Sequence, residues 1–200
     1  MSSSPYNFVF IGRSGCGKGT QADLLRKELE QKSGTGSVFY INTGSHFRNL
    51  VDHSEFLTAR LLNEKILQAG EKAPDALAIW ACTEELIHGV AETNHLIIDG
   101  SPRTALEAQV LEEMFGFFGR TNVFHIWLNA SDAWVYDRMM ERGRFDDKPE
   151  NIKNRLAYYE KFVVPAIEFY KNDSKHTFIE INGEQPVENV HRDIVKAIGL

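Results

Sequence analysis

The sequence predicts an α/β fold of three layers, in which helices cover both faces of a central five-stranded parallel sheet. Five short apolar runs, rich in β-branched and aromatic residues, are typical of buried strands. Segments with apolar residues at helical spacing separate these runs, and strands that alternate with helices form parallel sheets. A glycine-rich loop directly follows the first run, at the end of a strand where such sheets bind ligands.

The expected elements alternate along the whole chain. The strands are expected over residues 8–11, 37–42, 95–100, 122–129 and 176–181. A first helix follows the glycine loop, where Ala22, Leu25 and Leu29 recur at helical spacing. Further helices are expected over residues 56–69, 75–90, 132–141 and 150–171. Because the carboxyl ends of parallel strands meet at one edge of a sheet, the loops after the strands form the expected ligand site.

The glycine loop has the spacing of a phosphate-binding loop, or P-loop. In the stretch FVFIGRSGCGKGTQADLL, Gly12, Gly17 and Lys18 fit the pattern G-x-x-x-x-G-K. Backbone N–H groups of such a loop and of the following helix surround a phosphate, and the lysine supplies a cation. Gly19 follows the lysine here, so the hydroxyl common at that position is displaced to Thr20. The stretch predicts a strand, a phosphate-binding loop and a helix.

Composition and length predict one domain over residues 1–200. The net charge of −6 argues against a broad nucleic-acid surface. No apolar run approaches the roughly 20 residues of a membrane span, and the start MSSSPYN lacks the features of a secretory signal. We therefore expect a cytoplasmic protein with no membrane partner. Cys16 and Cys82 are too few for a four-cysteine zinc site, so no structural zinc is expected.

Six segments in order along the chain resemble the adenylate kinase family of nucleoside monophosphate kinases: GRSGCGKGTQ, NTGSHFR, AGEKAPD, IIDGSPRT, DRMMERGR and FDDKPENIKNRL...YYEKFVVPAIEFY. The resemblance implies phosphoryl transfer from magnesium-bound ATP to a nucleoside monophosphate by a monomeric enzyme. It also implies a helical monophosphate-binding insertion at about residues 42–73 and a lid at about residues 138–150. Only Gly143 separates Arg142 from Arg144 before FDDKPEN, so the lid is expected to be short.

The resemblance also implies roles for individual residues. The triphosphate would be bound by Gly15, Cys16, Gly17, Lys18, Gly19, Thr20, Arg138 and Arg142. The monophosphate site would contain Thr43, Arg48, Glu71, Lys72, Ala73, Gly100, Arg103, Arg144 and Arg155. Lys18, Arg138, Arg144 and Arg155 would be catalytic, and Asp99 would order Mg²⁺ through water.

Arginines suit this chemistry for a physical reason. Phosphoryl transfer between two anionic nucleotides depends mainly on positioning and on neutralising charge. The guanidinium binds phosphate through two parallel hydrogen bonds and keeps its charge at any working pH. An alternative interpretation is that the arginines between Arg138 and Arg155 pair with neighbouring acids. The candidate partners are Asp137, Glu141, Asp146 and Asp147.

Three departures from the family pattern lie in the expected site. Arg13-Ser14 stands where the family has a small residue and proline, which changes loop stiffness more than it changes the phosphate-binding amides. Ser45 replaces a common acid, and Ser101 replaces the common aromatic before Pro102. The last change is expected to loosen one wall of the monophosphate pocket.

The base that the enzyme accepts is the open question. In the family, a glutamine four residues after the arginine of the PR motif contacts adenine, but that count from Arg103 reaches Glu107. A carboxylate only accepts hydrogen bonds and so matches guanine better than adenine. On a regular helix, Gln109 points about 200° away from Glu107. It could contact the base only if the loop before the helix were two residues longer. We expect AMP, with two alternatives: a GMP or pyrimidine monophosphate kinase, or a non-catalytic nucleotide-binding regulator.

Overall fold

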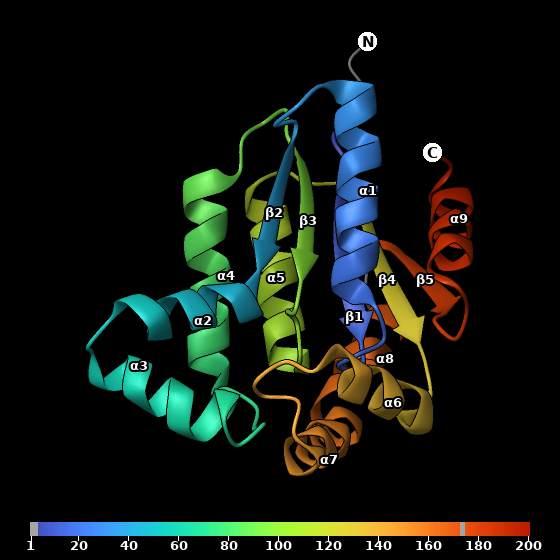
Figure 1. Cartoon of the computed structure of the whole chain (residues 1–200). Helices are drawn as coiled ribbons and strands as arrows, with labels where there is room; N and C mark the ends of the chain where they lie inside the picture. Colours follow the sequence, from blue (N-terminus) through green and yellow to red (C-terminus); the bar gives the residue numbers. More distant parts are fainter. Residues whose placement is uncertain (1–3, 173–174) are drawn as a thin grey trace.

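The sheet has five parallel strands in the order β2-β3-β1-β4-β5, which confirms the predicted fold class (Figure 1). The structure is a computed structural model and describes residues 4–172 and 175–200. The strands are β1 (Asn7–Gly12), β2 (Val38–Asn42), β3 (His95–Asp99), β4 (Val123–Asn129) and β5 (Thr177–Asn182). Each differs from its predicted range by one residue at one or both ends. β1 lies in the centre, between β3 and β4, so the glycine loop that follows it leaves from the middle of the sheet.

Helices cover both faces of the sheet, as the alternation of strands and helices predicts. One face packs against α1 (Lys18–Ser33) and α9 (Val187–Ile198), and the other against α4 (Asp75–Gly89), α5 (Ala105–Phe117) and α8 (Val164–Asn172) (Figure 1). In the part of the chain that the structure describes, no helix has the length and apolar character needed to cross a bilayer.

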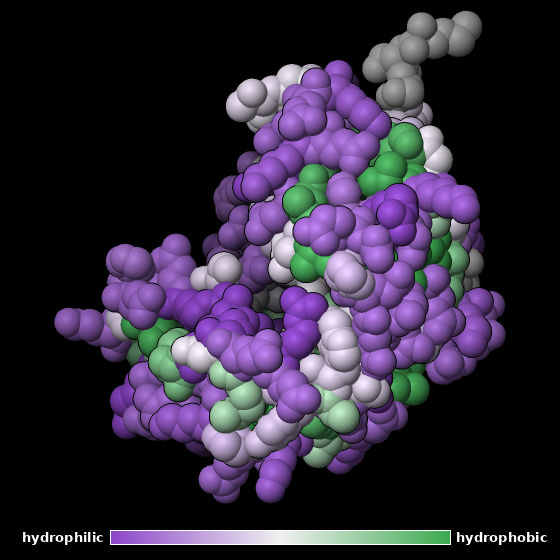
Figure 2. All heavy atoms as spheres, turned by 45° about the vertical axis from the view of Figure 1, so that its right-hand side comes forward, coloured by the Kyte–Doolittle hydropathy of each residue, from purple (hydrophilic) through white to green (hydrophobic). Residues whose placement is uncertain are grey.

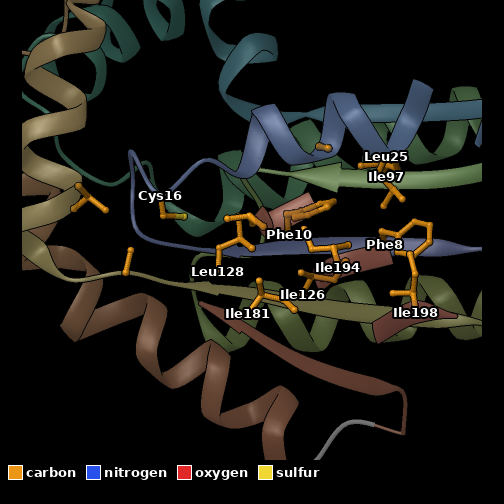
Figure 3. Packing of buried hydrophobic residues seen from close by; sticks show 14 of the residues in the cluster. Phe8, Phe10, Cys16, Leu25, Ile97, Ile126, Leu128, Ile181, Ile194 and Ile198 are labelled. Atoms are coloured by element: carbon orange, nitrogen blue, oxygen red, sulfur yellow. The ribbon is translucent and has the colours of Figure 1, made fainter. Parts of the chain in front are cut away.

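The two faces of the sheet form two separate cores because strand side chains alternate. Along β1, Phe8 and Phe10 point into the core beneath α1 and α9, where Figure 3 shows them beside Leu25 and Ile194. Val9 and Ile11 point into the other core. β1 and β3 are buried on both faces and are continuous apolar runs, so they were recognisable in the sequence.

Two groups of short helices project from the carboxyl edge of the sheet. An arm is formed by α2 (Thr43–His53), α3 (Leu57–Leu61) and the π-helix η1 (Leu62–Leu67) (Figure 1). A small core of its own, which includes Phe47, Leu62 and Ala81, joins this arm to α4. On the other side, α6 (Asp132–Arg142), α7 (Pro149–Tyr158) and the π-helix η2 (Tyr159–Val163) lead into α8.

Two of the predicted helices are interrupted. The helix expected over 56–69 is α3 followed by η1, and the helix expected over 150–171 is α7, η2 and α8 in succession. A π-turn inserts one residue into an α-helix and rotates everything after it, and such turns are frequent at functional sites. Both π-turns adjoin the cleft described below.

Candidate active site

A cleft of about 950 Å³ opens at the carboxyl edge of the sheet, between the arm and α6–α7. Figure 2 shows strongly hydrophilic residues around a hollow on this side of the molecule. The cleft brings together most of the residues that the sequence predicts as nucleotide-binding. Those on its wall are Gly15, Gly17, Lys18, Gly19, Thr20, Arg48, Glu71, Ala73, Asp99, Gly100, Arg103, Arg138, Arg142, Arg144 and Arg155.

Three predicted site residues lie just behind the wall. The Cys16 side chain packs in the core beneath α1, and its Sγ lies behind the loop, 3.8 Å from the Lys18 ammonium. Thr43 is buried at the start of α2, where its hydroxyl oxygen would lie 2.8 Å from a Cβ at Gly100. The Lys72 ammonium donates to the Asp75 carboxylate at 2.5 Å. These residues shape the site from behind.

The glycine loop positions the amino end of α1 at the cleft. Gly15 and Gly17 have φ of 85° and 102°, a left-handed backbone conformation that favours glycine. Gly17 is the N-cap of α1, and no side chain caps this end. The first N–H groups of the helix are therefore available to an anion. The Lys18 ammonium lies across the loop and donates to the carbonyls of Gly12 at 2.9 Å and Arg13 at 2.8 Å.

The Arg13 side chain anchors the loop to the helices beside it. Its guanidinium donates to Asp132 on α6 at 2.6 Å and to Glu160 on η2 at 2.5 Å. It also lies 4.0 Å from the centre of the Tyr159 ring. The first departure from the family pattern thus replaces a stiff proline-containing loop with one held by side-chain contacts.

Asp99 ends β3 with its carboxylate at the start of α1. A Cβ at Gly19 would lie 3.3 Å from Asp99 Oδ2, so glycine leaves the carboxylate room beside the loop. The same oxygen accepts hydrogen bonds from Asn42 Nδ2 at 2.8 Å and from the Tyr40 hydroxyl at 3.3 Å. Burial and the charge of Asp99 raise the pKa of Tyr40, so its phenol stays neutral and donates. Both hydrogen bonds fall on this one carboxylate oxygen.

Two buried acids hold the arginines of α6 and α7. Arg142 donates to Asp147 through two hydrogen bonds of 2.8 and 2.7 Å, and Arg155 donates to Asp147 at 3.0 Å and to Asp146. Although burial alone would raise the pKa of Asp147, the bonds and charge of Arg142 hold it below its ordinary value. The interpretation that these arginines pair with acids is correct for Arg142 and Arg155. Both also line the cleft, so the two interpretations are compatible.

The other arginines form a field of positive charge in the cleft. Arg138 lies 4.5 Å from the Trp134 ring centre, and Arg48 donates to the Ser45 hydroxyl at 3.2 Å. Burial lowers the pKa of Arg48, and the nearby charge of Arg144 lowers it further. Cations held this close together favour the binding of an anion that relieves their repulsion. An arrangement of this kind is suited to polyphosphate.

Comparison with known proteins agrees with this geometry. A family model described as adenylate kinase matches residues 10–175. The chain belongs to the adenylate kinase family. Adenylate kinase 1 of Nostoc sp. is 31% identical over 191 residues, which cover 96% of this chain and 97% of the relative. The adenylate kinase of Oenococcus oeni is 32% identical over 186 residues, covering 90% and 92%. That of Dehalococcoides mccartyi is 27% identical over 223 aligned positions, covering 96% and 98%.

Two departures from the family pattern contact each other. Glu107 Oε2 accepts hydrogen bonds from the Ser101 hydroxyl at 3.1 Å and from the Arg103 N–H at 2.8 Å. The Glu107 N–H in turn donates to the Thr104 side chain at 3.2 Å, which caps α5. Burial raises the pKa of the Glu107 carboxyl above its ordinary value. Ser101 and Glu107 therefore form one hydrogen-bonded unit that holds the loop carrying Arg103.

Gln109 is the other candidate for contact with the base. It is exposed on α5 and does not line the cleft. The loop before α5 shows the reason. Thr104 caps the helix directly, so α5 begins at Ala105, and Gln109 keeps the orientation that the regular helical count gives it. The structure does not bring its amide to the site.

Sequence reasoning missed several residues of the site. Asp146 and Asp147 were treated only as competitors for the arginines, although the pair of adjacent acids within the short lid was a usable signal. Asn42 and Tyr40, which contact Asp99, lie on the second strand run and carried no motif. Tyr158, which accepts from Arg103 at 3.1 Å, was assigned no role from the sequence, because this contact depends on how α7 packs against the loop before α5.

Proposed function

We propose that this chain is an adenylate kinase enzyme that reversibly transfers a phosphoryl group from Mg-ATP to AMP, giving ADP. Membership of the family supports the reaction type. The observation that carries the proposal is the convergence of the glycine loop with arginines from α2, α6, α7 and the loop before α5 in one cleft. Such a cleft can hold two phosphate chains end to end and neutralise both.

The two ends of the cleft suit different nucleotides. Lys18 and the amino end of α1 suit the ATP phosphates, because backbone N–H groups and an ammonium converge there. Arg48 and Arg103 suit the phosphate of the monophosphate, since they come from the arm and from the loop after β3. Arg138, Arg142, Arg144 and Arg155 approach from the lid side and would neutralise the charge of the phosphoryl group during transfer.

The donors present fit Mg²⁺ bound with ATP. Oxygen donors suit this ion, and the Asp99 carboxylate and Thr20 both lie on the cleft wall. We propose that Asp99 holds the ion through water. When bound, Mg²⁺ would neutralise part of the charge of the ATP phosphates. Asn42 and Tyr40 orient the carboxylate for this role.

We further propose that the arm at about 42–73 and the short lid at about 138–150 close over the substrates. Asn154 Nδ2 on α7 donates to the Ala69 carbonyl at 2.9 Å, so the two sides already touch at one end. Only residues 143–148 join α6 to α7. A lid of this size covers little surface, so side chains on the arm must help to exclude water.

We propose that the enzyme acts as a monomer in the cytoplasm. Cys16 and Cys82 are free and buried in separate cores, and free thiols are usual in a reducing compartment. Size-exclusion chromatography with light scattering tests the oligomeric state.

A coupled assay of ADP formation with a panel of monophosphates tests the activity and the base together. We expect native protein to have a higher kcat/KM for AMP than for GMP, CMP or UMP. Gln109→Ala is the matched control and should behave like native protein, because Gln109 lies outside the cleft. Glu107→Gln should keep the preference for AMP, since an amide carbonyl can still accept from Arg103 and Ser101.

Two results would contradict the proposal. A preference for GMP in native protein that Glu107→Gln shifts toward AMP would identify Glu107 as a reader of guanine. Nucleotide binding without turnover on any monophosphate would identify the chain as a regulator.

A further inference from the structure

The Tyr158 phenol lies where three parts of the site meet. Tyr158 is the last residue of α7 and lines the cleft together with Lys18, Arg103 and Arg155. Its hydroxyl oxygen accepts a hydrogen bond from Arg103 Nη1 at 3.1 Å. Ser14 of the glycine loop lines the same cleft, and its side chain interacts with the phenol. The phenol therefore lies between the loop before α5, which it contacts through Arg103, and the glycine loop.

A second, narrow pocket beside the main cleft shows the same meeting point. Its wall includes Gly12, Ser14, Lys18, Arg103, Arg155 and Tyr158. This pocket lies between the proposed ATP-phosphate end and the arginine proposed for the monophosphate. A side chain fixed here affects the relative placement of the two phosphates.

The charges around the phenol strengthen its hydrogen bonds. Burial by itself raises the pKa of Tyr158, but the charge of Arg103, the interaction with Ser14, and the charges of Arg155 and Lys18 outweigh it and lower the pKa. An oxygen that accepts from Arg103 still keeps its own proton for donation to a second group. The Arg103 guanidinium is fixed at a second point, because its Nε donates to the Gly100 carbonyl at 2.9 Å.

We propose that Tyr158 is a positioning residue of the phosphoryl-transfer centre, whose hydroxyl sets Arg103 relative to Ser14 of the glycine loop. This proposal rests on the proposed function. Arg103 would hold the accepting phosphate and the glycine loop the donating one, so the Tyr158 bridge aligns the two for in-line transfer. Misplacement of reacting groups by even about 1 Å lowers enzymatic rates markedly.

Tyr159, the next residue after Tyr158, points in a different direction, because adjacent residues on a helix lie about 100° apart. Tyr159 opens η2, and its ring lies beneath the Arg13 guanidinium. The Tyr159 hydroxyl accepts from Trp127 Nε1 at 3.1 Å, so it serves packing behind the loop. Tyr159 therefore offers a matched control for removal of a single buried phenol oxygen.

The test compares Tyr158→Phe with Tyr159→Phe in steady-state assays of ADP formation. Tyr158→Phe keeps the ring and removes the bridge, so we expect kcat to fall by about 10-fold or more, as for loss of a hydrogen bond to a charged group. The KM for ATP should stay at the native value, because Arg103 lies away from the proposed ATP end. Tyr159→Phe should keep native kcat. A purely structural role for Tyr158 would instead lower the melting temperature and leave kcat unchanged.

A double-mutant cycle with Ser14→Ala tests the bridge itself and serves if Tyr158→Phe folds poorly. Ser14→Ala alone should lower kcat, and adding Tyr158→Phe should cost less than the sum of the two single effects. Full additivity, or native kcat in a well-folded Tyr158→Phe, would overturn the proposal.

Calorimetric titration with AMP and with ATP separates this failure from failure of the proposed function. Native protein that binds neither nucleotide and forms no ADP would contradict the function, whereas an active native protein with an equally active Tyr158→Phe contradicts only the bridge.

Discussion

At the scale of single residues, the site combines groups that the sequence identified with partners that only the fold supplies. Lys18 was predictable because its motif fixes its role through spacing along the chain. The direction of the Glu107 side chain was not predictable. Its carboxyl accepts hydrogen bonds from Ser101 and Arg103, and a count of residues along the chain does not contain such contacts. The same count placed Gln109 correctly on the far side of the helix. The sequence thus predicts which face of a helix a residue lies on, whereas the rotamer of a polar side chain depends on its neighbours in the fold.

Lys18 gives the first prediction at this scale. Replacing Lys18 by alanine should lower kcat by about 100- to 1,000-fold, the cost of removing one preorganised donor from a transition state. The fold should survive, because the oxygen atoms that the ammonium contacts are the loop carbonyls of Gly12 and Arg13. Steady-state kinetics and the melting temperature measure the two effects.

Lys32→Ala is the matched control for this experiment. Lys32 lies in the last turn of the same helix, pairs with Glu28 at 3.0 Å and lies outside the cleft wall. It should keep native kcat. A Lys18→Ala protein with native kcat and native stability would refute the role of the loop in transfer.

At the scale of elements, the strands were predictable and the helix interruptions were not. A buried parallel strand is a continuous apolar run, and this signal does not depend on the rest of the fold. The interruptions at η1 and η2 add one residue to a helix whose apolar periodicity continues on both sides. A pattern averaged over several turns hides such an insertion. The directions of the residues after each interruption, from Tyr159 onward in the second case, therefore followed only from the structure.

Asp147 links two elements and gives a prediction of pH dependence. It accepts from Arg142 on α6 and from Arg155 on α7, so it holds the two helices together. Replacing Asp147 by asparagine removes the charge of a buried acceptor. This change should lower the free energy of unfolding by about 1–3 kcal/mol at neutral pH.

The sign of the pH effect follows from the pKa. The folded-state pKa of Asp147 lies below the ordinary value of 3.8. Its stabilising contribution is therefore present above about pH 4 and is lost as the pH falls through the lower folded-state value. The difference between native protein and Asp147→Asn should be constant near neutrality and shrink in acid. Denaturant titrations across pH measure it, with exposed Asp137→Asn on α6 as the control. A difference that persists unchanged at low pH would contradict the ion-pair role.

At the scale of the whole molecule, an acidic protein concentrates its cations in one cleft. The chain carries 28 acidic and 22 basic residues, yet Lys18, Arg48, Arg103 and the arginines of α6–α7 share one wall. This separation of charge depends on topology. The carboxyl ends of β1, β2 and β3 deliver the glycine loop, the arm and the Arg103 loop to the same edge. The sequence indicated this edge because each loop follows a recognisable strand. It did not indicate how the acids Asp146 and Asp147 would orient the arginines.

The proposed dependence on Mg²⁺ gives a prediction for the whole molecule. Removing divalent ions with EDTA should abolish ADP formation and leave the melting temperature of the protein unchanged. The reason is that the cores on the two faces of the sheet are apolar, and the described residues contain no cluster of three histidine, cysteine or carboxylate side chains able to hold a metal.

Mg-ATP, by contrast, should raise the melting temperature, because a ligand at about 100 times its Kd stabilises the folded state by about 2.7 kcal/mol. ATP with EDTA should raise it less. Adding back Mg²⁺ should restore turnover, and Zn²⁺ at the protein concentration is the control that should not. Unfolding by EDTA alone would show that a metal holds the fold together and would overturn the assignment of Asp99 as a ligand that acts only when nucleotide is bound.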